Sequence, residues 1–278
     1  MAKSKKKKKK KGINKLATFI LLLAFALMAG CFARQELQPQ PKESDGIELA
    51  IPSLAADVES QVIGHIGYTV SYNSTLRNPN WVAYELTAME TEGEESRNNR
   101  FIPDPDVNGT QAEDGDYKRS GWDRGHLAPA ADMKWSRQAM EESFYFSNIS
   151  PQNNNLNRGV WKYIEELTRD NAKRYEKVLV VTGPVFKSAK GKGCIGKNRV
   201  VIPDAFYKVL LVNDNGYKGI GFYCENKAGK KKLKTYARSI DEIEGMTGID
   251  FFQKLPDDIE DTVEKEFNWD DWKTGSRK

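Results

Sequence analysis

The sequence predicts an α+β domain with a largely antiparallel central sheet flanked by helices. Some stretches alternate apolar and polar residues, or are rich in β-branched and aromatic residues, and these predict strands. Longer stretches have apolar residues at helical spacing. The two kinds of stretch do not alternate regularly along the chain, whereas regular alternation would favour a parallel sheet.

The predicted elements run from residue 66 to residue 267. Strands are expected at Ile66–Tyr72, Trp81–Thr87, Val178–Thr182, Ala205–Val212 and Gly219–Cys224. Helices are expected at Ser136–Ser143, Leu156–Tyr175, Ile240–Met246 and Asp257–Phe267. The sequence Asn-Asp-Asn-Gly at 213–216 is typical of a hairpin, so the last two strands should pair antiparallel. Ser239 and Glu242 have the spacing of a capping box, and Gly245 or Gly248 would end that helix.

The first 59 residues are expected to lie outside the folded domain. Residues 1–30 combine nine lysines with an apolar run that starts at Leu16, as in a signal peptide. The run is shorter than the roughly 20 residues of a spanning helix, which leaves a membrane-spanning anchor as the alternative. The small residues before Cys31 resemble the lipobox of bacterial lipoproteins, in which this cysteine carries the lipid.

A tether rich in Gln, Pro, Glu, Asp and Ser follows the cysteine. We therefore expect a signal peptide (1–30), a lipidated Cys31 with a flexible tether (31–59) and a folded domain (60–278). The expected location is that of an exported bacterial lipoprotein, anchored to a membrane through its N-terminal lipid, in the periplasm or at the cell surface.

The charge of the chain after the expected signal peptide excludes a general attraction to nucleic acid. The whole chain has 43 basic and 39 acidic residues and a formal net charge of +4. Without the nine lysines of the signal, 34 basic residues face 39 acidic ones, and the net charge is −5. A polyanionic substrate must therefore be bound by a local group of arginine and lysine side chains.

Two cysteines follow residue 31, namely Cys194 and Cys224. In an oxidising compartment an even pair favours a disulfide, but the sequence does not show whether the two Cα atoms approach closely enough. A disulfide and two free thiols therefore both stay open.

Histidine is scarce in this chain, which narrows the choice of a general base. The only two are His65 and His126. Their unperturbed pKa of about 6.5 suits proton transfer near neutral pH. His126 follows Arg124, a planar five-donor fork that matches phosphate oxygens, and Gly125, which permits a tight turn. His126 is the candidate base, whereas His65 precedes an alternating strand and is interpreted as structural.

A second polar group lies at the start of the helix expected at 156–175. Asn157, Trp161 and Glu165 are four residues apart, so they share a broad helix face. Helical side chains tilt toward the N-terminus, so Glu165 can reach back, through a water, toward whatever Asn157 binds. A carboxamide with a carboxylate suits Mg²⁺, which keeps several waters. The alternatives are a helix cap for Asn157 and an exposed acid for Glu165.

These residues resemble the motifs of the DNA/RNA non-specific endonucleases, the ββα-metal family that includes the endonuclease G type. The resemblance covers most of the chain after residue 60. It is carried by Arg-Ser-Gly-Trp-Asp-Arg-Gly-His-Leu-Ala-Pro at 119–129, by 144–152, and by 157–161 with Glu165. Residues 181–184, 202–208 and 241–252 support it.

The resemblance implies a ββα-metal nuclease fold and metal-dependent cutting of DNA and RNA, single or double stranded, without sequence preference. It implies that His126 is the general base and that Asn157 is the one protein ligand of Mg²⁺, with Mn²⁺ as the alternative ion. Glu165 would hold a water of the ion's hydration shell. The products would carry a 5′ phosphate and a 3′ hydroxyl.

The same resemblance assigns three supporting residues. Asn148 would orient the site near Asn157. Arg124 and Arg97 would stabilise the charge that grows on the phosphate, with Arg100 as the alternative to Arg97.

Two other functions stay open from the sequence. One is a catalytically weak lipoprotein that binds extracellular nucleic acid, and the other is an enzyme that acts on a small phosphodiester. The presence of His126, Asn157 and Glu165 together favours the nuclease. The sequence does not indicate an oligomeric state.

Overall fold

The computed structural model describes residues 46–229 and 232–273. At its centre is a seven-stranded sheet in the order β1-β2-β3-β6-β9-β10-β11, in which all neighbouring strands are antiparallel. Its strands are β1 (Gln61–Gly64), β2 (Thr69–Asn73), β3 (Asn78–Thr87), β6 (Lys177–Val185), β9 (Ala205–Asn213), β10 (Tyr217–Glu225) and β11 (Ala237–Arg238). This architecture confirms the predicted α+β class.

Two small two-stranded sheets lie outside the main sheet. The first pairs β4 (Asp123–His126) with β5 (Ile149–Gln152), and the second pairs β7 (Cys194–Ile195) with β8 (Val200–Val201). No pattern in the sequence predicted these four strands. The predicted strand at Ile66–Tyr72 is also different, because a turn separates β1 from β2 there.

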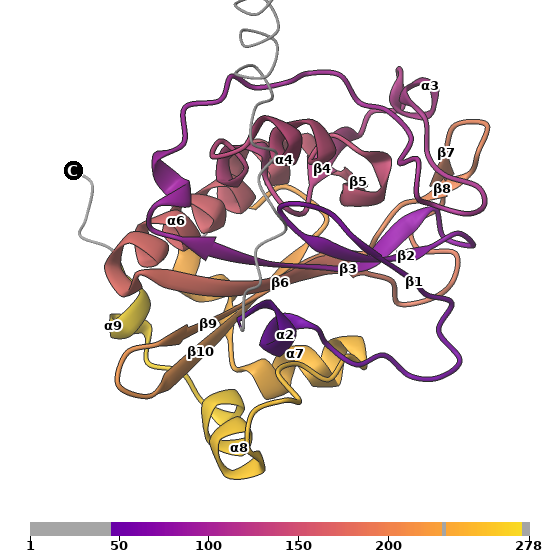
Figure 1. The fold of residues 1–278 in the computed structure, drawn as a ribbon. Helices are drawn as coiled ribbons and strands as arrows, with labels where there is room; N and C mark the ends of the chain where they lie inside the picture. The colour runs from indigo at the N-terminus through magenta and orange to yellow at the C-terminus, as the bar shows by residue number, and fades with distance from the viewer. Residues whose placement is uncertain (1–45, 230–231, 274–278) are drawn as a thin grey trace, which may run out of the picture. The chain divides into compact units, whose positions relative to one another are not determined.

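Helices cover both faces of the sheet (Figure 1). The longer ones are α4 (Arg137–Glu142), α6 (Lys162–Tyr175), α7 (Ile240–Thr247) and α8 (Asp257–Lys265). The shorter segments are α2 (Ile47–Ala50), η1 (Glu90–Glu92), α3 (Asp114–Tyr117), η2 (Ala130–Asp132), η3 (Phe146–Asn148), α5 (Asn154–Leu156), η4 (Asn157–Trp161), η5 (Leu233–Tyr236) and α9 (Trp269–Trp272). Helix α6 and the two-stranded β4–β5 sheet lie on one face of the main sheet, and α2, α7 and α8 lie on the other.

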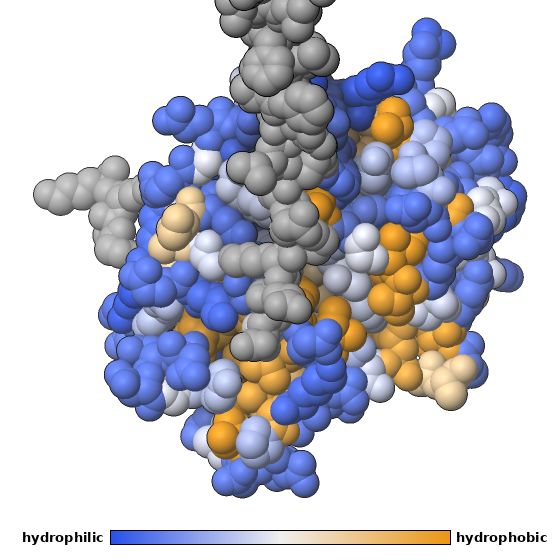
Figure 2. All heavy atoms as spheres, in the orientation of Figure 1, coloured by the Kyte–Doolittle hydropathy of each residue, from blue (hydrophilic) through white to orange (hydrophobic). Residues whose placement is uncertain are grey.

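Strand alternation divides the buried apolar side chains into two cores, one on each face. On β3, Tyr84 packs in the core on the α6 face, whereas its neighbour Ala83 packs in the core on the α7 face. The first core includes Trp161 and Ile164, and the second includes Ile243. Because successive side chains of a strand point to opposite faces, one sheet supports both cores. Figure 2 shows apolar side chains gathered around α2 and α7 on a mostly hydrophilic face.

Helix α7 begins and ends as its sequence predicted. Ser239 and Glu242 form the capping box, and Gly248 ends the helix with a left-handed conformation at φ 69°. The helix packs closely on β10, where a Cβ at Gly221 would come within 2.5 Å of Ile243 Cγ1. Glycine is needed at this position because of that close approach.

Two expectations differ from the structure, and one open question is answered by it. The helix expected at 156–175 is interrupted by a π-helical turn, η4, in which Gly159 has non-helical angles. Part of the stretch expected to be a tether is ordered, because Ala50 is buried in a core and Ser53 pairs with Asp250. The two later cysteines are free thiols, Cys194 exposed and Cys224 buried, so they do not form a disulfide.

Cys31 and the expected signal peptide lie outside the described residues. The boundary at residue 30 therefore stays a prediction, whereas ordered structure begins before the expected boundary at residue 59. Within 46–229 and 232–273, no helix is both long and apolar enough to span a bilayer.

Candidate active site

His126 lies at the end of β4 in the two-stranded β4–β5 sheet, directly opposite Ile149 of β5. Gly125 pairs with Ser150, and a Cβ at Gly125 would come within 2.6 Å of the Gln152 side chain. Close packing in a strand therefore explains Gly125, rather than the tight turn that the sequence suggested. Strands β4 and β5 and helix α6 lie on the same face of the sheet (Figure 1).

Asn148 supports the backbone that follows His126. Its side chain is fully buried, and its carboxamide accepts from Ala128 N at 2.9 Å and donates to Ala128 O and Ser143 O, both at 2.8 Å. These bonds use both the donor and the acceptor side of the carboxamide. Asn148 is thus placed to position the loop after His126, while the structure shows no bond from it to Asn157.

The His126 imidazole lies in an apolar, cationic setting. Its ring centroid is 4.9 Å from that of Phe144 and 5.4 Å from that of Phe101, and only 8% of the residue is exposed. Its buried Nε2 has no hydrogen-bond partner among the described residues. Burial, with the charge of Arg97, lowers the pKa of His126 to about 3. The imidazole is therefore neutral at physiological pH, as a proton acceptor must be.

Two of the three candidate arginines lie beside this imidazole. The guanidinium carbon of Arg97 is 5.0 Å from the centroid of Phe144, the ring that contacts His126. The guanidinium of Arg124 lies 5.2 Å from the Phe101 ring and bonds to Asp114 Oδ1 at 2.6 Å. Arg97 also influences the pKa of His126, whereas Arg100 does not. The structure thus favours Arg97 over Arg100.

Asn157 stands at the start of the π turn and is oriented by β4. Its Nδ2 donates to Asp123 Oδ2 at 3.1 Å, so its Oδ1 is the atom left to accept from, or bind to, a ligand. Asp123 also accepts from Asn154 and, through two bonds of 3.0 Å each, from Arg158. Asp123 and His126 are three residues apart on one strand, about 10 Å along its axis. Asn157 is therefore attached to the start of the strand that ends in His126.

Glu165 lies on α6 next to a network of buried charges that the sequence reasoning missed. Asp132 is fully buried and accepts from Arg169 Nη1 at 2.7 Å and from Tyr84 at 2.9 Å. Lys208 is also fully buried, and its Nζ donates to Leu127 O at 3.3 Å, directly after His126. Glu165 itself is half-buried.

The network sets the charge of Glu165. Burial raises the pKa of Glu165, and the charge of Asp132 raises it further. The charges of Lys208, Arg169 and Arg97 lower the same pKa. Burial likewise lowers the pKa of Lys208, against the attraction of Glu165 and Asp132. One sign of this network was visible in the sequence, because Lys208 interrupts an otherwise apolar predicted strand. Asp132 and Arg169 carried no such sign.

Arg97 connects the two halves of the candidate site. It lowers the pKa of both His126 and Glu165, so its charge faces both groups. Asp123 makes the second connection, through its bond to Asn157. Charge therefore links His126 to Glu165 through Arg97, and a hydrogen bond joins Asn157 to the strand that carries Arg124 and His126. Their roles stay predictions.

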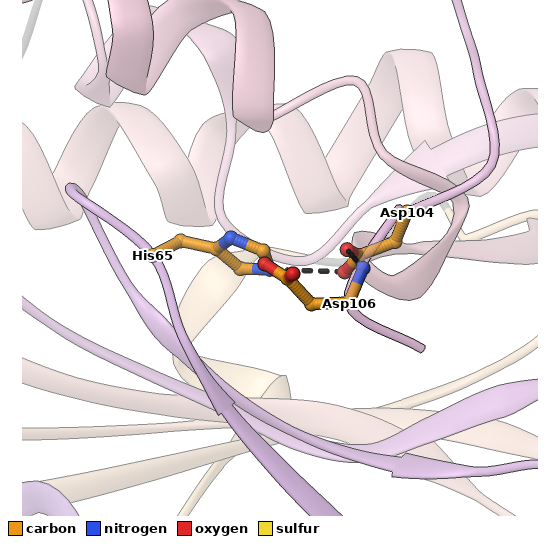
Figure 3. Close-up of side chains that lie close together, drawn as sticks. All are labelled: His65, Asp104 and Asp106. Carbon is orange, nitrogen blue, oxygen red and sulfur yellow. Dashed lines mark hydrogen bonds and ion pairs between the residues drawn. The ribbon is translucent and has the colours of Figure 1, made fainter. Parts of the chain in front are cut away.

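The other histidine belongs to a separate group with Asp104 and Asp106 (Figure 3). One ligand atom from each of the three lies within 4.8 Å of the others. However, His65 Nε2 and Ser147 Oγ both bond to Asp104 Oδ2, at 2.9 and 2.5 Å, and Asp106 N donates to Asp104 Oδ1 at 3.0 Å. These bonds already satisfy Asp104, which agrees with the structural interpretation of His65.

A family model described as DNA/RNA non-specific endonuclease matches residues 45–258. The chain is 35% identical to "Nuclease EXOG, mitochondrial" of Xenopus laevis over 86% of this chain and 73% of that protein. It is 37% identical to "Endonuclease G, mitochondrial" of Homo sapiens over 67% of this chain and 60% of that protein. The solved structure titled "Crystal structure of the EndoG/EndoGI complex: Mechanism of EndoG inhibition" superposes with a TM-score of 0.67 at 27% identity, over 77% of this chain and 92% of that chain.

The comparisons contradict one expectation from the sequence. The frog and human relatives are both named as mitochondrial nucleases. The expected location as an exported, membrane-anchored bacterial lipoprotein was therefore wrong. The apolar run before Cys31 had suggested it, and that run lies outside the described residues.

Proposed function

This chain belongs to the DNA/RNA non-specific endonuclease family, and we propose that it hydrolyses phosphodiester bonds with His126 as general base beside a Mg²⁺ ion bound by Asn157. One observation carries the proposal. The buried His126 Nε2 has no partner, and its environment keeps it neutral. A buried polar atom without a bond is costly, and such atoms concentrate where a substrate or water completes them.

His126 supplies the base. Its neutral imidazole accepts a proton from the water that attacks phosphorus, and the Phe101 and Phe144 rings hold the ring in place. Asn148 fixes the backbone after this residue, so the ring cannot shift along the strand. Proton transfer then depends on a preset orientation rather than on a change in fold.

Arg97 and Arg124 bind and stabilise the phosphate. The attack places additional negative charge on the phosphate oxygens, and guanidinium donors fixed in advance stabilise that charge most in the transition state. Arg124 retains one buried Nε without a partner, although its Nη2 bonds to Asp114. That free donor supports a role toward a ligand.

The residues around Asn157 fit a hydrated divalent cation. Asn157 directs its amide nitrogen to Asp123, which leaves Oδ1 to bind the ion, and Glu165 provides a nearby carboxylate. Oxygen ligands with many retained waters are typical of Mg²⁺, and Mn²⁺ accepts the same ligands. When bound, the ion would offset charge on the phosphate and on the leaving 3′ oxygen. The resulting ends are a 5′ phosphate and a 3′ hydroxyl.

The same residues explain cutting without sequence preference. His126, the two arginines and Asn157 address phosphate and water, and phosphate contacts carry no sequence information. A catalytically weak nucleic-acid-binding protein is the alternative, and the family to which the chain belongs does not favour it.

Cutting of circular plasmid and of RNA tests the proposal. The purified protein should cut both in Mg²⁺ and neither in excess EDTA. His126→Gln should lose about 10²- to 10⁴-fold in rate, as expected when a general base is removed. His65→Gln is the matched control, because glutamine can still donate to Asp104. Near-normal cutting by His126→Gln, with thermal unfolding unchanged and contaminating nuclease excluded, would overturn the mechanism.

A further inference from the structure

A group of carboxylates lies between α7 and α8, away from the candidate active site. Asp241 and Glu244 come from α7, and Glu264 comes from α8. One carboxylate oxygen from each lies within 4.8 Å of the others. The two helices pack against the sheet on the face opposite to α6 (Figure 1). The proposed nuclease mechanism uses none of these three residues.

Glu264 is the unusual member of this group. Only 6% of it is exposed, and its Oε1 is buried with no hydrogen-bond partner among the described residues. Glu244 is half-buried, and one of its oxygens accepts from Phe251 N at 2.8 Å. Asp241 is exposed. A buried carboxylate oxygen that faces two other carboxylates and lacks a donor needs either a proton or a positive partner.

The described part of the chain does not provide that partner. Asp250 and Glu260 lie close enough to raise the pKa of Glu264 further. None of the ion pairs within 46–229 and 232–273 includes any of these five acids. Burial first, and then the neighbouring carboxylates, raise the pKa of Glu264 to about 9 and that of Glu244 to about 7.

We propose that Asp241, Glu244 and Glu264 bind a Ca²⁺ ion that links α7 to α8. Ca²⁺ takes six to eight oxygen ligands at about 2.4 Å, so oxygens on opposite sides of it lie about 4.8 Å apart. The spacing of the three carboxylates fits that limit. Mg²⁺ needs a smaller and more regular shell and gives up water reluctantly, so it fits this group less well. Because Asp241 is exposed, water molecules can reach the ion on that side and would complete its coordination shell.

The His65 group does not have the same features. Its central carboxylate, Asp104, is already satisfied by three hydrogen bonds, whereas Glu264 has an oxygen with none. The proposed ion would stabilise the packing of α7 on α8 and would not touch the reacting phosphate. Its removal should therefore change stability rather than the chemical step.

Calcium binding by the full chain tests this site. Equilibrium dialysis with radioactive Ca²⁺ should show one ion fewer per chain for Glu264→Gln than for the wild type. Glu266→Gln is the matched control, because Glu266 is exposed at the end of the same helix. Counting the difference between variants separates this site from the ion expected at Asn157.

Thermal unfolding provides the second measurement. Ca²⁺ at 100 times its Kd should raise the Tm of the wild type and of Glu266→Gln by roughly 5 to 11 °C. The Tm of Glu264→Gln should not show this rise. In EDTA, Glu264→Gln should be at least as stable as the wild type, because glutamine needs neither a proton nor a cation at this buried position. If this variant fails to fold, Asp241→Asn takes its place.

Equal numbers of bound ions in the wild type and Glu264→Gln would overturn the proposal. So would a Ca²⁺-induced rise in Tm that is the same in both. Neither result would bear on the nuclease activity, which is assayed separately with Mg²⁺.

Discussion

The two faces of the sheet both bury carboxylates, but they balance them differently. On the α6 face, Asp132 bonds to Arg169, and Lys208 lies near both Asp132 and Glu165. On the α7 face, Glu264 lies near other acids and forms no ion pair within residues 46–229 and 232–273. A buried charge needs an opposite charge close by. The first face therefore provides its own cations, and the second implies a cation from solution.

The balance on the α6 face suits the proposed chemistry. A site that binds a polyanion must keep its own acids compensated, or the phosphate would be repelled. Lys208 and Arg169 offset the charge of Glu165, while Arg97 and Arg124 lie against the rings that contact His126. The folded part has a negative net charge. Nucleic-acid binding therefore depends on where these few cations lie.

The largest expected effect follows from removing a cation of the α6 face. Arg169→Met leaves the fully buried Asp132 without its guanidinium, and burial already raises the pKa of Asp132 against the opposing effect of Arg169. Breaking such a pair should lower the free energy of unfolding by about 3 to 5 kcal/mol, as measured by urea denaturation. Arg137→Met breaks an exposed pair with Glu141 and should cost less than about 1 kcal/mol. Equal losses would contradict the distinction between the two kinds of pair.

The next effect concerns catalysis rather than stability. Arg97→Ala should lower kcat/KM by about 10²- to 10³-fold, because it removes a preset donor for the phosphate. Arg100→Ala should leave the rate nearly unchanged, since it is Arg97 that lies against the Phe144 ring and lowers the pKa of His126. Initial rates on plasmid in Mg²⁺ compare the two. A larger loss for Arg100→Ala would reverse the assignment.

Asp123 offers a graded test of how β4 orients Asn157. Asp123→Ala removes the acceptor of the Asn157 amide and should lower activity or metal affinity by about 10- to 100-fold. Asp123→Asn keeps one acceptor oxygen and should lose less. Titration of activity with Mg²⁺ measures both. If the two variants behave alike, the negative charge of Asp123, rather than its hydrogen bond, is the important property.

The last effect is the pH dependence of stability that His126 contributes. Its pKa is about 3 in the folded protein and about 6.5 when unfolded, so between these values the unfolded chain binds more protons. This contribution is complete above about pH 6.5 and is lost as the pH falls toward 3. Urea midpoints in EDTA between pH 4 and 7 should therefore fall less for His126→Gln than for the wild type. Parallel curves would show that His126 is not buried as described.

Much of the fold followed from periodicity in the sequence. Strands such as β9 and β10 are continuous alternating or apolar runs, and the capping box of α7 depends only on neighbours along the chain. The two-stranded β4–β5 sheet is different, because its four-residue strands are polar and pair over a long sequence separation. The π turn at Asn157 was equally hidden, since a helical pattern does not reveal one extra residue in a turn.

The site was predictable where a residue type was rare or a motif was specific. His126 and Asn157 were proposed in this way, whereas Asp132 and Arg169 were not, because acids and arginines on a helical stretch usually face solvent. Lys208 was the exception, as a charge within an apolar strand. Glu264 was hidden for the same reason as Asp132, since its burial depends on how α8 packs against α7.

The most direct test of the account is to locate the metal. Diffraction from crystals containing Mn²⁺, recorded for its anomalous signal, should place an ion against Asn157 Oδ1, on the side of β4 and α6 that carries His126 and Glu165. An anomalous peak at His65, Asp104 and Asp106, with none at Asn157, would contradict the assignment of the active site.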